Sequence, residues 1–207
     1  MNEDPSAWFA RSVLDGEFVR LEPISLDHLA GLIEAGRDAR IWTWMPADGS
    51  TADGMAAIVE SAVAALEART MLPFVTIERA SGRVVGSSRY LNIAPADLRL
   101  EIGWTWIDPA FQRTAVNTEA KLLMLGRAFD ELGCRRVELK TDALNEQSRA
   151  AILGIGATFE GIFRRHMVMT GGRARDSAYY SILDDEWPVI RDRLRARLER
   201  RRAVSRP

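Results

Sequence analysis

A predicted strand that leads through a polar loop into an amphipathic helix constrains the fold most. Residues 98–108 alternate like a strand and break at Asp108-Pro109, and the loop 112–117 then leads into apolar side chains with helical spacing. A helix N-terminus leaves backbone N–H groups without partners and carries a partial positive charge, so it suits an anion such as phosphate. The segment therefore predicts either a phosphate-binding junction or a capped core helix, with Asn117 as the expected N-cap.

Two common phosphate-binding loops are excluded at this junction. The loop has no Gly-Lys-Ser/Thr sequence, which a Walker loop requires, and no glycine, which a dinucleotide-binding fingerprint requires. If the junction binds phosphate, its own backbone N–H groups must form the concave nest. Arg113 then either adds a positive charge or lies in solvent.

The order of the remaining segments predicts an α+β fold with three layers, in which helices cover both faces of a mixed, mostly antiparallel sheet. Strands are expected at 18–24, 73–80, 84–93, 98–108, 135–142, 158–169 and 174–183, and helices at 26–36, about 51–69, 145–156 and 185–202. The loop and the helix that follows it span about 112–132. The sequence has no internal repeat and no linker, so residues 1–207 are predicted to form one domain. Residues 1–16 are expected to be an N-terminal extension, and residues 185–207 an arginine-rich helix and tail.

Composition excludes several classes of protein. The net charge of −1 creates no global field toward nucleic acid or membrane, so neither DNA nor a membrane is an expected partner. Cys134 is the only cysteine, which excludes an intramolecular disulfide and a cysteine-based metal cluster, and no metal is expected. No apolar run is long enough to span a bilayer, and the N-terminal segment lacks a signal-peptide core, so the expected location is the cytoplasm.

Several motifs occur together in a specific order. The strand "LEIGWTWI" is followed by a proline, a loop that begins at Gln112, a long helix, another strand, and an Asn-x-x-Ser motif on a helix that ends at Gly156. This order and spacing resemble the GNAT superfamily of acyl-CoA N-acyltransferases, and within it the Rim-type branch, whose namesakes acetylate the N-termini of ribosomal proteins. The resemblance extends from "FVRLEPI" to "DSAYYSILDDEW". It implies a sheet of about seven strands with a V-shaped split between the fourth and fifth strands.

The resemblance implies acetyl-CoA, or another acyl-CoA, as co-substrate. In the family the loop binds the pyrophosphate through its N–H groups, and the split takes the pantetheine arm. Ala115 stands where the family usually has a glycine, and alanine suits that position only if its φ is negative. Asn145 is expected to contact the pantetheine amide, to cap its helix, or to do both. The implied coenzyme-binding residues are Trp106, Ile107, Gln112, Arg113, Thr114, Ala115, Val116, Asn117, Thr118 and Asn145.

Aminolysis of a thioester requires a base for the amine, a donor for the oxyanion and a proton for the leaving thiolate. The resemblance makes Glu101 the expected base, acting through water, and the alternative is a surface glutamate on an alternating strand. A backbone N–H near Trp106 is the expected oxyanion donor. Many relatives protonate the thiolate with a tyrosine, whose position is Ile152 here. Ser148 matches the serine of the Rim-type pattern, so it is the expected acid or a hydrogen-bonding partner of the sulfur.

The acceptor is expected between the loop 41–46 and the last hairpin of the chain. The aromatic side chains of that loop are interpreted as a pocket wall, and the alternative is a lid over the core. His166 is a reserve base or a structural histidine, and Asp176 either contacts the acceptor ammonium or stabilises the hairpin. The expected substrate-binding residues are Trp42, Trp44, Met45, Ser87, Arg89, Tyr90, His166, Asp176 and Tyr179.

The expected function is transfer of an acetyl group from acetyl-CoA to a primary amine by direct attack in a ternary complex. The amine belongs to a protein N-terminus or to a small molecule. One alternative is a catalytically weak or silent acyl-CoA-binding sensor, because Ala115 and Ile152 depart from the family pattern. The acyl chain, the acceptor and a homodimer, which is frequent in the family, stay open.

A ribosome-associated binding protein is the second alternative. Residues 191–202 hold seven arginines, which is typical of a surface that contacts RNA. The competing interpretation of this segment is a solvated terminal helix that docks through Leu194 and Leu198.

Overall fold

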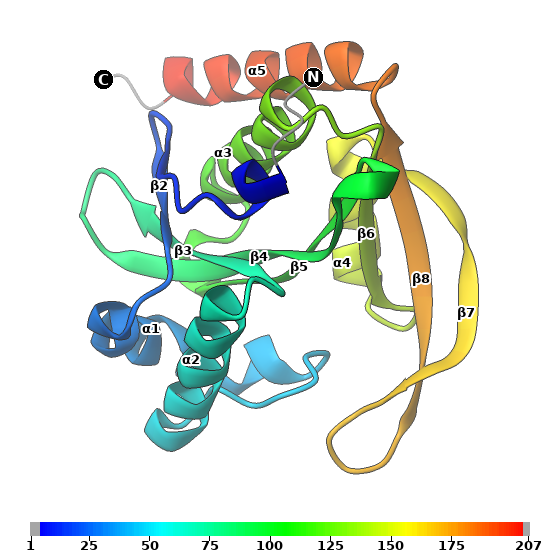
Figure 1. The fold of residues 1–207 in the computed structure, drawn as a ribbon. Helices are drawn as coiled ribbons and strands as arrows, with labels where there is room; N and C mark the ends of the chain where they lie inside the picture. The colour runs from blue at the N-terminus through cyan, green and yellow to red at the C-terminus, as the bar shows by residue number, and fades with distance from the viewer. Residues whose placement is uncertain (1–4, 205–207) are drawn as a thin grey trace.

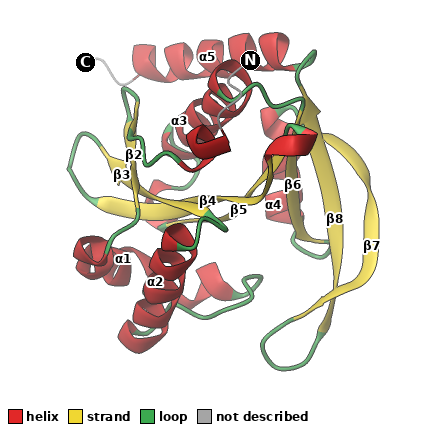
Figure 2. Cartoon of the chain, in the orientation of Figure 1, coloured by secondary structure: helices red, strands yellow, loops and turns green. Residues whose placement is uncertain are grey.

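The computed structural model describes residues 5–204, whose eight-stranded sheet lies between two layers of helices (Figures 1 and 2). The strands are β1 (Leu14–Asp15), β2 (Val19–Pro23), β3 (Leu72–Glu78), β4 (Val84–Ala94), β5 (Arg99–Ile107), β6 (Arg136–Asp142), β7 (Thr158–Val168) and β8 (Ala174–Leu183). The α-helices are α1 (Leu29–Gly36), α2 (Ala52–Glu67), α3 (Val116–Gly126), α4 (Glu146–Ile155) and α5 (Trp187–Val204). A π-helical turn, Arg127–Glu131, continues α3, and short 3-10 turns occur at Pro5–Phe9, Leu26–His28, Ala39–Trp42, Pro95–Asp97 and Pro109–Phe111.

The predicted split in the sheet is confirmed between β5 and β6. The strand order is β1-β2-β3-β4-β5-β6-β8-β7, and only the β5–β6 pair is parallel among the described strands. These two strands pair only where Arg99–Glu101 faces Arg136–Glu138. Beyond that point β5 continues to Ile107 and β6 to Asp142 without pairing. Backbone groups on the β6 side of β5 are therefore open for a ligand.

One strand more than predicted is present at the N-terminal edge. It is β1, a two-residue strand that pairs with β2 inside the segment expected to be an extension. Trp8 and Leu14 from this segment are buried in the hydrophobic core. The segment consequently packs onto the sheet and contributes to its stability.

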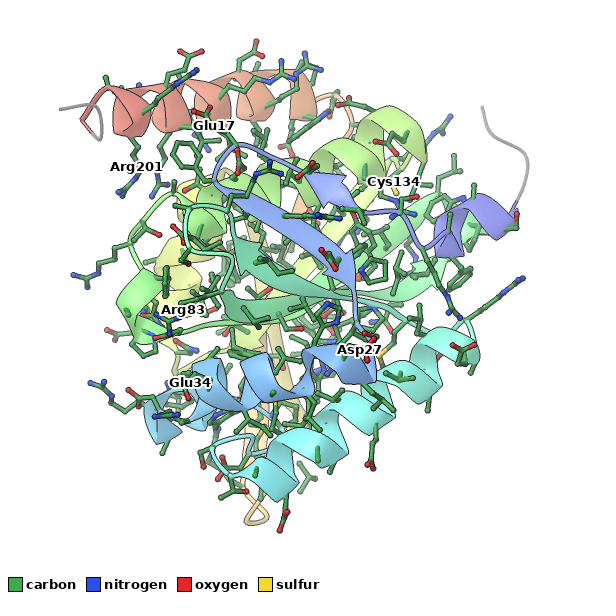
Figure 3. All side chains as sticks on the ribbon, turned by 90° about the vertical axis from the view of Figure 1, so that its left-hand side faces the viewer. Glu17, Asp27, Glu34, Arg83, Cys134 and Arg201 are labelled. Carbon is green, nitrogen blue, oxygen red and sulfur yellow. The ribbon has the colours of Figure 1, made fainter. Side chains whose placement is uncertain are left out.

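The sheet separates two hydrophobic cores. On one face α1 and α2 pack over side chains that include Val75 and Trp106, with Met55 and Val59 of α2 fully buried. On the other face α3, α4 and α5 cover a larger core, to which Tyr90 contributes (Figure 1). Cys134 is buried in this larger core (Figure 3).

Helix α5 crosses the outside of α3. Leu194 and Leu198 are buried on its inner side, as the docked-helix interpretation predicted. Glu17 lies beside this helix, where its carboxylate pairs with the Arg202 guanidinium at 3.0 Å (Figure 3). Among residues 5–204, no helix is long and apolar enough to cross a membrane.

Candidate functional site

The loop between β5 and α3 is held by its own side chains. The Asp108 carboxylate accepts a hydrogen bond from the Ala110 N–H at 2.9 Å, and the Thr114 hydroxyl donates to the Phe111 carbonyl at 2.6 Å. Arg113 carries the left-handed backbone conformation, with φ of 60°. Ala115 has φ of −70°, so the alanine in the usual glycine position is free of backbone strain.

The N-cap of helix α3 lies two residues before the predicted one. Ala115 is the N-cap and Val116 the first helical residue, so the prediction of Asn117 as N-cap is wrong. Asn117 instead lies in the first turn, where its Oδ1 atom is buried without a partner. The N-cap has no side chain that could bind the first N–H groups, which leaves them available for another acceptor.

The N–H groups around the start of α3 form a concentrated set of free donors. The Val116 N–H donates to the Thr114 hydroxyl at 3.3 Å. The other N–H groups of the turn find no acceptor among residues 5–204, and they belong to Arg113, Thr114, Ala115, Asn117 and Thr118. Free donors at a helix N-terminus favour an anion with several oxygen atoms.

Gln112 joins the loop to both sides of the split. Its side-chain amide donates to the Ile107 carbonyl at 3.1 Å and accepts from the Gln147 amide at 3.0 Å. Its own backbone N–H donates to the Pro109 carbonyl at 3.3 Å. Gln112 therefore connects the end of β5 to the start of α4, and its predicted contact with phosphate would require one of these bonds to open.

A β-bulge interrupts β5 beside the split. Ser87 pairs with Trp106 and Arg89 pairs with Gly103, so β5 has one more residue than β4 in this interval. Trp104 lies in the bulge with φ of 51°. A bulge turns backbone groups away from the regular ladder. A backbone N–H at this bulge is therefore a candidate for the predicted oxyanion donor.

The predicted pantetheine-binding residues at the end of β5 have their side chains in the two cores. Trp106 packs against Trp42, with ring centroids 5.2 Å apart, and Ile107 belongs to the core on the opposite face. The Ile107 carbonyl already accepts from Gln112. Only the remaining backbone groups of this segment are therefore available to a ligand.

Glu101 is a buried carboxylate at the narrow end of the split. Its side chain is 1% exposed, so the alternative of a surface glutamate is excluded. Its Oε2 atom accepts from Lys140 Nζ at 2.9 Å and from Asn92 Nδ2 at 2.8 Å. A Cβ atom built on Gly103 would lie 2.9 Å from Oε1, so this second oxygen packs closely over the glycine and excludes a larger residue there. A cleft of about 570 Å³, partly lined by Asn92, Trp104 and Lys140, adjoins this group.

The start of α4 faces the loop across the split. The Asn145 side chain accepts a hydrogen bond from the Ser148 N–H at 3.0 Å, which confirms its predicted capping role. The Ser148 hydroxyl is half-buried and has no hydrogen-bond partner among the described residues. Ile152, at the position of the family tyrosine, is buried in the core.

The loop 41–46 closes against the last hairpin. Trp42 is buried, and its Nε1 donates to the Gly36 carbonyl at 2.7 Å, so the pocket-wall interpretation is wrong for this residue and the core-lid alternative is right. Trp44 is partly exposed, with the Arg173 guanidinium 5.7 Å from its ring. Thr170 donates to the Pro46 carbonyl at 3.0 Å, which connects the loop to the β7–β8 turn. Met45 is partly buried against the α1–α2 core.

Two of the three residues predicted on β4 do not line an acceptor site. Tyr90 is fully buried on the α3 face, where its hydroxyl donates to the Met124 carbonyl at 2.6 Å. The Ser87 hydroxyl donates to the Phe74 carbonyl at 2.8 Å and is also buried. Arg89 lies on the same face as Ser87, and its guanidinium stacks on the Trp104 ring at 4.2 Å.

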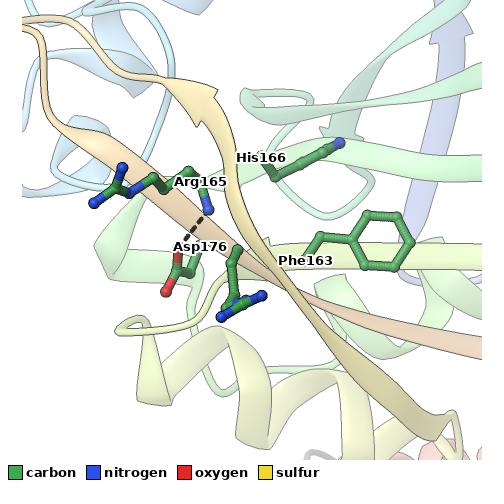
Figure 4. A pocket seen from close by; sticks show the side chains of 5 residues that line it. Phe163, Arg165, His166 and Asp176 are labelled. Atoms are coloured by element: carbon green, nitrogen blue, oxygen red, sulfur yellow. Dashed lines mark hydrogen bonds between the residues drawn. The ribbon is translucent and has the colours of Figure 1, made fainter.

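His166 lies on the β7–β8 hairpin at a hollow of about 820 Å³ lined by Phe163, Arg164, Arg165 and Asp176 (Figure 4). Its ring contacts the Ser177 hydroxyl at 3.0 Å and the Tyr179 hydroxyl at 3.3 Å. Partial burial, together with the positive charges of Lys140 and Arg175, lowers the pKa of His166. The neutral imidazole, which can accept a proton, is therefore favoured.

Asp176 and Tyr179 have structural partners on the same hairpin. The Asp176 carboxylate accepts a hydrogen bond from the Arg165 N–H at 2.6 Å (Figure 4). This contact agrees with the interpretation that Asp176 stabilises the hairpin. Tyr179 stacks on Phe163, with ring centroids 4.1 Å apart. Its ring also faces Lys140, which pairs with it across β6 and β8.

No motif in the sequence singles out Lys140, Asn92 or Lys121. Lys140 and Asn92 bind the Glu101 carboxylate, and Lys121 lies on α3 beneath the bulge. Lys121 and Lys140 are the only lysines of the chain, and that rarity among 28 basic residues was the one signal available. Within residues 5–204, no group of three or more His, Cys, Asp and Glu side chains could hold a metal ion.

The fold and the N–H cluster define a class of protein. A mixed sheet that splits beside a helix N-terminus is the arrangement expected for an acyl-CoA-dependent transferase. The family described as Acetyltransferase (GNAT) domain matches residues 19–158, and the chain belongs to this family.

Relatives and solved structures agree with this assignment. A candidate ribosomal N-acetyltransferase of Bacillus subtilis, YdaF, is 33% identical over 106 residues, which are 51% of this chain and 57% of that protein. The chain thus spans little more than half the length of that curated relative. A GCN5-related N-acetyltransferase from Brucella melitensis superimposes with a TM-score of 0.84 at 35% identity, over 90% of this chain and 85% of that chain.

A third similarity concerns the fold alone. RimJ of Mycobacterium smegmatis, solved in complex with CoA-disulfide, superimposes with a TM-score of 0.74 at 24% identity, over 89% of this chain and 90% of that chain. The name of the YdaF relative is in line with the expected resemblance to the Rim-type branch.

Proposed function

We propose that this chain is an N-acyltransferase that transfers an acetyl group from acetyl-CoA to a primary amine. The observation that carries the proposal is the set of unpartnered N–H groups at Arg113–Ala115 and Asn117–Thr118, directly beside the split between β5 and β6. Such a cluster suits the pyrophosphate of coenzyme A, and the split suits its pantetheine arm. Family membership supports the same donor.

The transfer is a single displacement at the thioester carbonyl. The amine nitrogen attacks the carbonyl carbon, a C–N bond forms, and the tetrahedral oxyanion collapses with cleavage of the C–S bond. The amine proton goes to a base, and the departing thiolate takes up a proton to leave as free coenzyme A. In this proposal a backbone N–H at the Trp104 bulge stabilises the oxyanion, and Ser148 or water supplies the proton to sulfur.

Glu101 is the proposed base, with a water molecule between its carboxylate and the amine. Lys140 and Asn92 fix one oxygen, while the other packs closely over Gly103. His166 is the alternative base, because its lowered pKa favours the neutral form. An acyl-enzyme on Cys134 is disfavoured, since burial raises the pKa of this thiol to about 12 and keeps it protonated.

The loop is tested by removing one N–H without changing the charge. Ala115 has φ of −70°, which proline tolerates, and its N–H has no partner in the free protein. Ala115→Pro is therefore expected to weaken coenzyme A binding about tenfold or more in calorimetry, since a hydrogen bond to a charged group is lost. Ala115→Gly keeps the N–H and is the matched control. Equal affinities for the two variants, at equal unfolding temperatures, would refute the proposal that these N–H groups bind the pyrophosphate.

The acceptor is tested by thiol release from acetyl-CoA. A panel of small amines and N-terminal peptides includes peptides from ribosomal proteins, because the YdaF relative is named for them. Turnover with any of these amines distinguishes an enzyme from a silent sensor. The sensor is the second candidate, and the buried Ile152 in the tyrosine position favours it. Coenzyme A binding without release of thiol across the panel would support the sensor.

A further inference from the structure

Arg89 is a buried arginine without an acidic partner. Arg89 is 4% exposed, and its Nε atom has no hydrogen-bond acceptor. The guanidinium stacks on the Trp104 ring at 4.2 Å and forms no ion pair with a described residue. A buried charge is costly unless it is paired, and burial alone lowers the pKa of Arg89 to about 10.

Lys121, on the α3 side of the sheet, also lacks an acidic partner, but its ammonium donates to two hydroxyls. The other buried or partly buried cations near the split differ from Arg89 in this respect. Lys140 is paired with Glu101. Arg173 is paired with Asp142. Arg175 has the charges of Asp142 and Glu101 in electrostatic range. Arg89 is the exception among these groups, so its environment lacks the anion that a buried guanidinium requires.

The position of Arg89 relates it to the reacting groups. Arg89 pairs across the β4–β5 ladder with Gly103, and Leu91 pairs with Glu101, so all four residues lie on the same face of the sheet. Gly103 has no side chain, and a Cβ atom there would lie within 2.9 Å of Glu101 Oε1. Arg89 and the proposed base therefore lie on one face of the sheet, two residues apart along the ladder, and Trp104, whose ring contacts Arg89, lines the cleft of about 570 Å³ beside Glu101.

We infer that Arg89 binds a carboxylate of the substrate, with Trp104 holding the plane of the guanidinium. This inference rests on the proposed acyl transfer and names the chemical class that the site selects. A guanidinium whose plane is fixed by an aromatic ring can present two parallel N–H donors, which match the two oxygens of a carboxylate. Desolvation strengthens such a pair, so a neutral substrate would leave the guanidinium unpaired and bind more weakly.

Two sources of carboxylate could reach this cleft. One is the acyl group of a dicarboxylic acyl-CoA, and the other is the acceptor, through the carboxylate of an amino acid or an acidic peptide. Donors and acceptors therefore form separate arms of the test. The donor arm compares succinyl-CoA with butyryl-CoA, which has the same number of acyl carbons without the carboxylate. The acceptor arm compares primary amines as free acids with the same amines as carboxamides.

The variants are Arg89→Met, Arg89→Lys and a control, Arg195→Met, on the exposed side of α5. In one of the two arms, the wild-type enzyme is expected to show a kcat/KM about tenfold or more higher for the compound with the carboxylate than for the compound without it. Arg89→Met is expected to abolish that preference, Arg89→Lys to retain part of it, and Arg195→Met to leave it unchanged. The affinity for free coenzyme A is expected to be the same in all four proteins. Unfolding temperatures show whether Arg89→Met is folded. If it is not, a reduced carboxylate preference in Arg89→Lys provides the test.

Two results would overturn the inference. The first is turnover that is indifferent to the carboxylate in both arms of the wild-type enzyme. The second is an equal loss of affinity for free and acylated coenzyme A in Arg89→Lys, which would make Arg89 a contact of the carrier itself. Failure of the proposed function looks different, because no donor would then release thiol with any amine.

Discussion

Replacing Lys121 by methionine should stabilise the protein, and the gain should depend on pH. Lys121 lies on α3 and is 5% exposed, with Nζ donating to the Thr105 hydroxyl at 2.6 Å and to the Ser88 hydroxyl at 3.2 Å. Both partners are neutral, and burial lowers the pKa of the ammonium group from 10.5 to about 7. The folded protein therefore holds this charge at a cost.

The size and sign of that cost follow from linkage. Between about pH 7 and 10.5 the unfolded lysine keeps a proton that the folded one has lost, so stability rises with pH. The two pKa values give a penalty of about 5 kcal/mol at pH 6 and about 3 kcal/mol at pH 8.5. Wild-type stability should thus gain about 2 kcal/mol from this group between the two pH values.

Methionine removes the titrating group and keeps most of the volume. The Ser88 and Thr105 hydroxyls lie 2.7 Å apart, so they retain each other as hydrogen-bond partners. Loss of the two lysine hydrogen bonds costs about 1–2 kcal/mol, which leaves a net gain of about 3 kcal/mol at pH 6. Because this loss is the same at both pH values, the pH dependence isolates the charge.

Urea unfolding of both proteins at pH 6 and pH 8.5 measures the effect. Other titrating groups cancel in the difference between Lys121→Met and wild type, and about 2 kcal/mol should remain, equivalent to a midpoint shift of about 1 M. An identical pH dependence in the two proteins would refute the reasoning. Lys140→Met is the matched contrast: it leaves the Glu101 carboxylate buried without its cation, so it should destabilise by about 3–5 kcal/mol.

Two further substitutions test the proposed chemistry. Glu101→Gln should lower kcat about 100-fold or more while coenzyme A affinity is unchanged, because a general base is lost; turnover that persists at all pH values would transfer the role to another group such as His166. Asn145→Ala removes the cap of α4 and should cost about 1 kcal/mol of stability in thermal unfolding. If Asn145 also binds pantetheine, coenzyme A affinity should fall as well, and an unchanged affinity would leave it a cap alone.

The parts of the site that were predictable from sequence are those encoded by local signals. The strand end at Asp108-Pro109 and the cap at Asn145 depend on neighbouring residues, and both occur where predicted. The partners of Glu101 could not be predicted in this way. Lys140 comes from β6, 39 residues further along, and meets Glu101 only because the two strands pair in parallel at that point.

The errors on β4 and in the loop 41–46 have a common physical origin. Alternation indicates which residues share a face but does not say which face is the site. Tyr90 was placed in the acceptor site, yet it faces α3, while Arg89 beside it faces α1 and α2. Trp42 has the composition of a pocket wall, but its indole N–H is satisfied by the Gly36 carbonyl inside the core.

The bulge at Trp104 determines which β5 side chains reach the site. Thr105 and Trp106 alternate normally, since Thr105 contacts Lys121 of α3 and Trp106 belongs to the α1–α2 core. In a regular strand Glu101 would lie on the same face as Thr105 and would point toward α3. The extra residue reverses this alternation, so Glu101 shares a face with Trp106 and Arg89.

The same bulge also brings the Trp104 ring onto Arg89. The proposed base and the proposed carboxylate receptor are thus consequences of a single inserted residue. Deletion of Trp104 should restore the regular ladder, turn Glu101 into the α3 core and remove the ring from Arg89. Acyl transfer and carboxylate preference should then be lost together, while the N–H cluster at α3, which lies beyond the bulge, should still bind coenzyme A in calorimetry. Retention of turnover in a folded deletion variant would show that the bulge does not orient the site.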